Sequence, residues 1–249
     1  MVKFALLAAV ALAAADSAPA PYDYNACLKL ANRHPDEALE MAMNARGTGE
    51  DSKEDAGAEH CAAVALVGLK QYGEAARRLD KLARSGASGN AEVRAQLLGQ
   101  AGNAWILAGQ PELATASFTA ALSLMPGEAE YLIDRSRASA LSKKWSAAET
   151  DLSAALASEP GNVSALVLRA SARRAQKNIK GAVGDVTQAL LLQENNVEAL
   201  VERGLLRAAQ GDKAGARQDF LAVLEKAPYS EAAASARMEI EKLEVKKKS

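Results

Sequence analysis

Two cysteines and two histidines near the beginning of the chain are the residues best suited to chemistry. Cys27 and Cys61 are the only cysteines and lie 34 positions apart, and His34 and His60 lie close to them in the sequence. Thiolate and imidazole are the groups that zinc prefers, so these four side chains could bind a metal. Their spacing matches no common zinc motif, and adjacent ligands on a helix would point about 100° apart. We therefore predict no metal site.

A disulfide and a pair of free thiols are the other two states open to these cysteines. In an exported chain, an even pair of cysteines favours a disulfide between Cys27 and Cys61. In a reducing compartment the same residues would be free buried thiols. We predict the disulfide and leave the thiols as the alternative.

Arrangements that support catalysis are missing from the sequence. It contains no His-Glu-x-x-His pattern, no glycine-rich phosphate loop and no Gly-x-Ser-x-Gly elbow. The acidic residues are spread along the chain and form no constellation for acid–base or nucleophilic chemistry. We predict that the protein is not an enzyme and uses no cofactor.

The elements that must position these residues are helices. Residues 129–162 form two amphipathic segments with a tight turn between them, followed by Pro160-Gly161-Asn162. Apolar and small residues three and four apart place one face of each helix against the other. Helices of this length are marginal alone in water, so the pair must stack on neighbouring pairs.

The same pattern recurs at a step of 34 residues. Three sets of residues share this interval: Pro126, Pro160 and Pro228; Ala114, Ala148, Ala182 and Ala216; and Phe118, Leu152, Val186 and Phe220. This pattern resembles the tetratricopeptide repeat family, which has a period of 34 residues and small residues where its helices cross. The resemblance implies an all-α, right-handed solenoid of stacked antiparallel helix pairs that serves as a binding scaffold.

Composition agrees with this fold class. Hydrophobic residues make up 49% of the chain and aromatic residues only 4%, so the apolar content is mostly alanine and leucine. Such content suits close helix packing and argues against a sheet core. The formal net charge is −1, so the chain lacks the strong basic field that attracts nucleic acid. We expect no nucleic-acid partner.

The first 20 residues are predicted to be a secretory signal peptide. Lys3 gives a positive start, residues 4–15 are apolar but too few to span a bilayer, and small residues follow. We therefore expect export by a bacterium to the periplasm or beyond, with no membrane span after the signal is removed.

Three parts are expected after this segment. Residues 22–94 should form degenerate helix pairs, with a polar connection at 47–57 and helices at about 58–69 and 72–84. Residues 95–230 should form four repeats in strict register. Residues 231–249 should form a terminal capping helix with a basic tail, as an open solenoid end requires.

Two sets of charged residues share the 34-residue interval. The basic set is Arg135, Arg169 and Arg203, and the acidic set is Asp151, Asp185 and Asp219. Arginine in the first helix and aspartate in the second recur in many tetratricopeptide-like units. We predict three Arg–Asp ion pairs between the helices of each unit, with a structural role.

The resemblance also implies a partner-binding groove lined by the first helix of each unit. The residues carried over by register are Asn103, Ile106, Glu130, Ile133, Arg137, Val167, Ser171, Arg174 and Val201, together with Gln96, Ser164, Glu198 and Leu205. This mixed surface suits an extended or helical peptide.

The function expected from these features is a protein- or peptide-binding adaptor in the cell envelope. The alternative is a structural protein that associates with itself, so that its own terminus or a second copy fills the groove. The sequence leaves the partner and the oligomeric state open.

Overall fold

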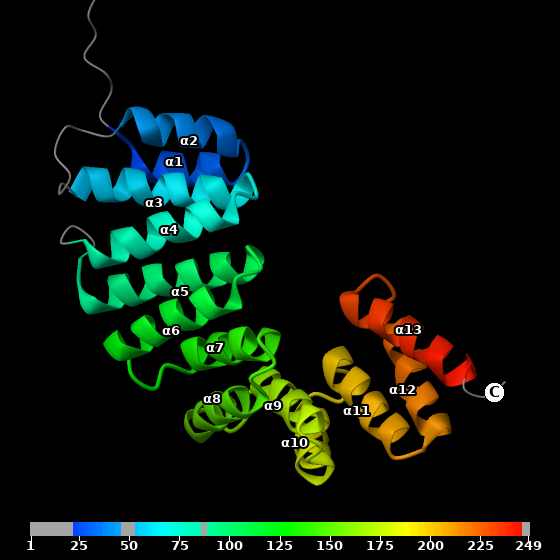
Figure 1. Cartoon of the computed structure of the whole chain (residues 1–249). Coiled ribbons are helices and arrows are strands. Elements are labelled where there is room, and N and C mark those ends of the chain that lie inside the picture. Colours follow the sequence, from blue (N-terminus) through cyan, green and yellow to red (C-terminus); the bar gives the residue numbers. More distant parts are fainter. Residues whose placement is uncertain (1–21, 46–52, 86–88, 246–249) are drawn as a thin grey trace, which may run out of the picture.

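The chain folds entirely into α-helices within residues 22–45, 53–85 and 89–245, which are the residues that the computed structural model describes (Figure 1). The predicted signal peptide lies outside them. None of the described helices combines the length and apolar character needed to cross a bilayer. The helices are α1 (Tyr24–Ala31), α2 (Pro35–Asn44), α3 (Lys53–Gly68), α4 (Tyr72–Arg84), α5 (Ala91–Leu107), α6 (Pro111–Leu124), α7 (Ala129–Leu141), α8 (Trp145–Ser158), α9 (Val163–Ala175), α10 (Ile179–Leu192), α11 (Val197–Ala209), α12 (Lys213–Lys226) and α13 (Glu231–Val245).

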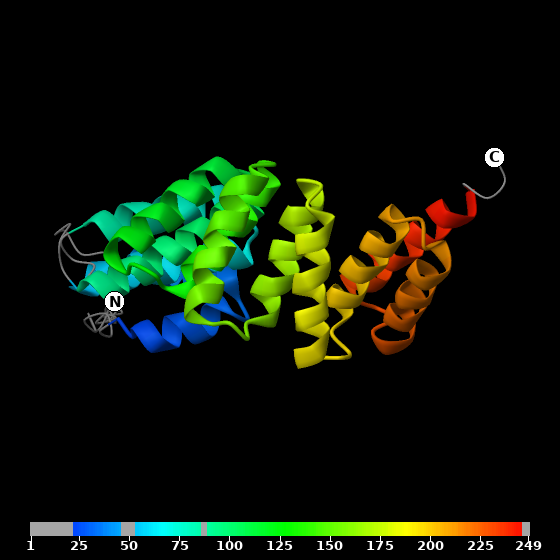
Figure 2. The same ribbon diagram turned by 90° about the horizontal axis from the view of Figure 1, so that it is seen from below.

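Successive helices pack against one another as antiparallel pairs, and each pair packs on the next. We call the odd-numbered members first helices and the even-numbered members second helices. From α1 to α7 the helices lie in a single stack, and the direction of the stack changes through α8 to α13 (Figures 1 and 2). The structure confirms the predicted all-α solenoid.

Helix bounds match the prediction closely in some units and differ in others. Helix α4 covers the predicted 72–84, whereas α3 begins at Lys53, inside the segment predicted to be a polar connection. Gly57 is accommodated within α3 because the ring of Tyr24 packs over it, 3.4 Å from where a Cβ would lie. Helix α5 begins four residues before position 95, because the side chain of Asn90 caps it by accepting the Val93 N–H at 3.0 Å.

The turn inside each pair depends on one residue in the left-handed conformation. Gly109, Lys143, Lys177 and Gly211 occupy this position in four successive units, with φ between 57° and 89°. Glycine adopts such a φ without steric cost, whereas lysine does not. The two lysines are therefore held in a conformation that the turn imposes.

The core of each pair depends on a small residue of the first helix facing a large residue of the second. A Cβ added to Gly102 would lie 2.6 Å from the Phe118 ring, and one added to Gly204 would lie 2.5 Å from the Phe220 ring. In the two intervening units, Ser136 and Ala170 take the glycine position, and the phenylalanine position is filled by smaller residues: Leu152 and Val186. The volumes on the two helices therefore compensate each other from unit to unit.

Replacing Gly204 by Ala is expected to destabilise the fold, because the new methyl group would overlap the Phe220 ring. Overpacking of this kind costs roughly 1–3 kcal/mol. The cost should largely disappear when Phe220 is also replaced by Val, which recreates the pairing of Ala170 with Val186. Denaturant unfolding of both single variants and the double variant should give a coupling energy above about 0.5 kcal/mol.

Gly184→Ala provides the matched control for this comparison. It also lies within a helix, but no atom lies within 4 Å of the position of its added Cβ. This change should be neutral or stabilise the fold by roughly 0.5–1 kcal/mol, because alanine is the better helix former. Equal losses of stability at positions 184 and 204 would contradict the packing account.

The N-terminal pair is joined to the next by a disulfide. Cys27 of α1 is bonded to Cys61 of α3, with a Cα–Cα distance of 6.1 Å, and both side chains are fully buried. With the two sulfur atoms bonded to each other, the thiolates that a zinc site needs are absent. His60 instead contacts Tyr24 and Gln100, while His34 is exposed beside Glu37.

Cys27→Ser is expected to lower the free energy of unfolding under oxidising conditions by on the order of 3 kcal/mol, because the crosslink restricts the unfolded chain. Thermal unfolding with and without reductant measures this effect. Under reductant the unmodified protein should lose most of its advantage over the variant. Equal midpoints under oxidising conditions would show that the bond contributes nothing.

Candidate binding face

The first helices form a continuous wall, because α5, α7, α9 and α11 each contact the next first helix as well as their own partners. The residues predicted to line a groove differ in their exposure along this wall. Three are exposed: Asn103, Glu130 and Arg137. Five are half-buried: Ile106, Val167, Ser171, Arg174 and Val201. We call the surface made by these eight residues the first-helix face; their role in partner binding stays a prediction.

Ile133 differs from the other predicted residues because it is buried. Only 7% of its surface is exposed, and it belongs to the same core cluster as Leu156 and Val163. It therefore holds neighbouring units together instead of presenting a surface. Val167 and Val201 pack against the same cluster but remain partly accessible.

Polar side chains link neighbouring first helices across this face. Asn103 of α5 donates to Asp134 of α7 at 3.4 Å, and Arg174 of α9 donates through Nη2 to Glu202 of α11 at 3.2 Å. Asp134 and Glu202 are both buried. We did not single them out from the sequence, although the register offers a signal, because they occupy the same repeat position.

The two arginines of the first-helix face are neutralised by these buried carboxylates. Arg137 pairs with Asp134 and also donates to Ser164 at 3.3 Å, and Arg174 pairs with Glu202. Both arginine side chains keep some exposure, at 46% and 31%. They can therefore still donate hydrogen bonds to a ligand, but they add little net charge.

Exposed leucines extend this face at one end of the first helices. Leu107 and Leu141 are the last residues of α5 and α7, and they are 56% and 58% exposed. They share one repeat position, so the register could have identified them as members of the face. Exposed aliphatic groups of this size gain free energy when a partner covers them.

The opposite end of α7 is acidic. Burial raises the pKa of the Tyr131 hydroxyl, and the negative charges of Glu130, Glu128 and Glu92 raise it further. The first-helix face therefore runs from an acidic end to an end with exposed leucines.

Ion pairs between first and second helices hold the wall from behind. The three predicted pairs are confirmed: Arg135 with Asp151 at 2.7 Å, Arg169 with Asp185 at 2.8 Å, and Arg203 with Asp219 at 2.7 Å. Each aspartate is buried. The hydrogen bond to Asp151 raises the pKa of Arg135, which keeps this arginine charged.

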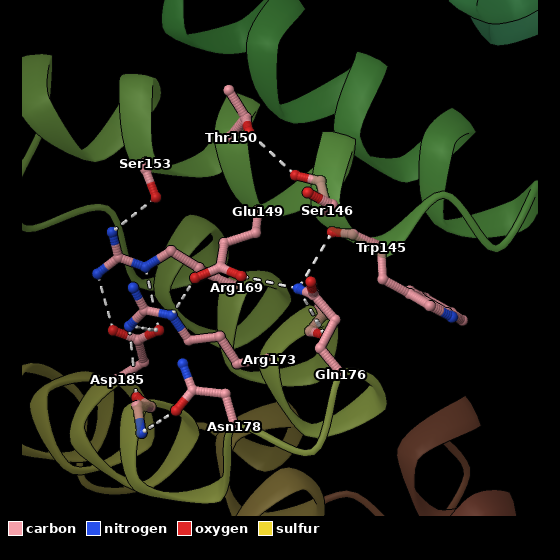
Figure 3. A network of polar contacts seen from close by, with 12 residues as sticks. Trp145, Ser146, Glu149, Thr150, Ser153, Arg169, Arg173, Gln176, Asn178 and Asp185 are labelled. Atoms are coloured by element: carbon pink, nitrogen blue, oxygen red, sulfur yellow. Dashed lines mark hydrogen bonds and ion pairs between the residues drawn. The ribbon is translucent and has the colours of Figure 1, made fainter.

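The structure adds a second arginine to two of these aspartates. Arg173 donates to Asp185 at 2.9 Å and to Glu149 of the preceding unit at 2.8 Å, so it joins two units (Figure 3). Arg207 donates to Asp219 at 2.8 Å in the same way. Sequence analysis missed both arginines, although they too are 34 positions apart.

Comparison with known proteins identifies the class of fold. No family model matches the sequence, and no curated protein matches it. Among solved structures, residues 41 to the end of MamA from Desulfovibrio magneticus RS-1 are 19% identical, with a TM-score of 0.61, covering 74% of this chain and 99% of that chain. YrrB, described as a TPR protein with an unusual peptide-binding site, is 21% identical with a TM-score of 0.57, covering 72% of this chain and 91% of that one.

These similarities, together with the 34-residue packing pattern, define a helical-repeat solenoid. Its fold is that of tetratricopeptide repeat proteins.

Asp185→Asn is expected to lower the free energy of unfolding by roughly 1–3 kcal/mol, because two arginines would lose their buried anionic partner. Urea unfolding measures the change. Glu74→Gln is a control: its pair with Arg77 is exposed and should contribute at most about 1 kcal/mol. A loss at Asp185 no larger than that at Glu74 would contradict a buried structural role.

Acid is expected to remove the contribution of Glu149. The hydrogen bond from Arg173 lowers the pKa of Glu149 below its ordinary value of 4.5. A lowered folded pKa means that this carboxylate stabilises the fold above about pH 4.5 and loses that contribution as the pH falls through the folded value. Glu149→Gln should therefore be less stable than the unmodified chain near neutral pH.

Unfolding at about pH 7 and about pH 3 tests this prediction, because the difference between the two proteins should shrink in acid. Glu130→Gln is the control, since Glu130 is exposed and has no ion pair among the described residues. A difference at position 149 that does not change with pH would contradict the assignment.

Proposed function

We propose that the protein is a non-catalytic scaffold that binds a protein or peptide on its first-helix face. The observation that carries this proposal is the face itself, where exposed leucines adjoin arginines whose charge is already neutralised. Such a surface favours a partner recognised by shape, apolar contact and hydrogen bonds. The peptide-binding site named for YrrB, which shares the fold, supports the same class of function.

We further propose that the protein acts in the cell envelope after export. The apolar segment at residues 4–15 and the small residues after it support this location. The buried disulfide between Cys27 and Cys61 adds support, because such bonds persist in oxidising compartments. Intact mass measurement of the protein recovered from the envelope would test it: loss of an N-terminal segment is expected, and an unprocessed cytosolic chain would contradict it.

The alternative function is self-association through the same face, with a second copy or the chain's own terminus as the occupant. A monomer that captures a different protein supports the adaptor. Recovery of the protein alone, with a mass that depends on concentration, supports the alternative.

Pull-down from crosslinked envelope preparations tests the proposed face. Asn103→Arg and Ser171→Arg place a long charged side chain near the middle of α5 and α9 without removing a buried ion pair. Each should reduce recovery of the partner about tenfold or more, because hot-spot losses exceed 1–2 kcal/mol.

Thr150→Arg and Gln218→Arg are the matched controls. They add the same charge at exposed positions of second helices, in α8 and α12, and should leave recovery unchanged. Arg174 is unsuitable for this test, because its replacement would leave Glu202 buried without a partner. Equal recovery by all four variants would place the interface elsewhere on the molecule.

A further inference from the structure

One edge of the solenoid carries exposed lysines in three successive turns. We call this surface the basic edge; it consists of Lys143, Lys144, Lys177, Lys180 and Lys213. The turns adjoin in space: the α7–α8 turn contacts the start of α6 through Ser142 and Glu112 at 2.8 Å, and Gln176 contacts Glu149 near the start of α8 at 2.7 Å. The lysines therefore form one row.

The opposite edge carries exposed glutamates in the connections between pairs. We call it the acidic edge; it consists of Glu128, Glu130, Glu159, Glu194 and Glu198. Gln188 near the end of α10 donates to the backbone oxygen of Pro160 at 3.2 Å, which joins two of these connections. Residues 124–130, 158–164 and 191–198 contain no basic residue.

Figure 1 shows the two edges in the first part of the stack. The turns after α3 and α5 lie on one side, and the connection from α6 to α7 lies on the other. The same alternation continues along the chain, because first and second helices are antiparallel.

Helix dipoles do not account for this separation of charge. Each edge contains the ends of one set of helices and the beginnings of the other, so the dipoles favour neither sign there. Internal ion pairs do not account for it either, because none of the ten residues forms one within the described part of the chain. With a net charge of only −1, the chain is nearly neutral but strongly polarised across its width.

Exposed aliphatic side chains accompany both edges. Leu107 and Leu141 directly precede turns on the side of the basic edge. Leu191 and Leu192, which are 82% and 52% exposed, directly precede a connection on the acidic edge. Apolar groups beside charges indicate a protein partner, because small ions would leave the leucines uncovered.

We propose that copies of this chain associate side by side, with the basic edge of one copy against the acidic edge of the next. The two edges complement each other in charge, and both repeat with the same period, so several turns can meet at once. Lysine at the left-handed positions 143 and 177, where Gly109 and Gly211 stand in other units, is consistent with selection for this charge. The contact leaves the first-helix face open, so it goes beyond the proposed function and does not depend on it.

This contact joins two different surfaces, so each added copy leaves one edge unused and association is open-ended. Sedimentation of the purified protein over a range of concentrations tests the proposal. At low ionic strength the mean mass should rise with protein concentration, and added salt should return it to the monomer because exposed charges are screened.

Two charge-reversed variants locate the contact. A basic-edge variant carries Lys144→Glu, Lys180→Glu and Lys213→Glu, and an acidic-edge variant carries Glu128→Lys, Glu159→Lys and Glu194→Lys. All six positions are exposed, so the fold should persist, as circular dichroism would verify. Each variant alone should associate about tenfold or more weakly than the unmodified protein.

Mixing the two variants gives the decisive result. One then has two acidic edges and the other two basic edges, so the mixture should regain the high mass that neither variant shows alone. Lys29→Glu with Lys81→Glu, at exposed positions away from both edges, is the control and should associate like the unmodified protein.

Three results would overturn the proposal. They are a monomer at every concentration in low salt, association that both edge variants retain, and a mixture that stays monomeric. A monomer that binds anionic lipid vesicles through the basic edge would also overturn it and assign that edge to a membrane.

Discussion

The close approach of the two helices within each pair is the constraint on which the rest of the structure depends. At Gly102 and Gly204 the first helix has no side chain, and the ring of Phe118 or Phe220 fills the space. This contact fixes the register between the helices, and repeating it fixes the 34-residue interval. It also accounts for the abundance of alanine, because each unit needs small residues wherever two helices cross.

Charge is organised around this packing in two layers. Behind the wall, buried aspartates receive one or two arginines and tie first helices to second helices. On the wall, Asp134 and Glu202 tie one first helix to the next. Removing one member of such a pair leaves a buried charge, so these links specify geometry even where their net contribution to stability is small. The first-helix face is consequently rigid and nearly neutral.

The fold was predictable because its decisive interactions are local and periodic. The Arg169–Asp185 pair lies within one unit, so a fixed interval in the sequence was enough to predict it. Contacts between units were harder to predict. Asp134 and Glu202 could be recognised as buried only once neighbouring first helices were placed side by side. The early start of α3 depended on Tyr24, which comes from a different pair.

The candidate face was predicted less completely than the fold for the same reason. Register alone assigned Ile133 to a groove, but packing between units buries it. Leu107 and Leu141 stand at a repeat position that register could have supplied, yet only the structure shows that their side chains are exposed.

The central claim is that a partner occupies the first-helix face, and site-specific photocrosslinking in cells tests it most directly. A photoreactive residue placed at Asn103 or Ser171 should yield a crosslink to another protein, whereas the same residue at Thr150 or Gln218 should yield none. Crosslinks from the second helices alone would contradict the claim, because they would place the partner on the other side of the wall.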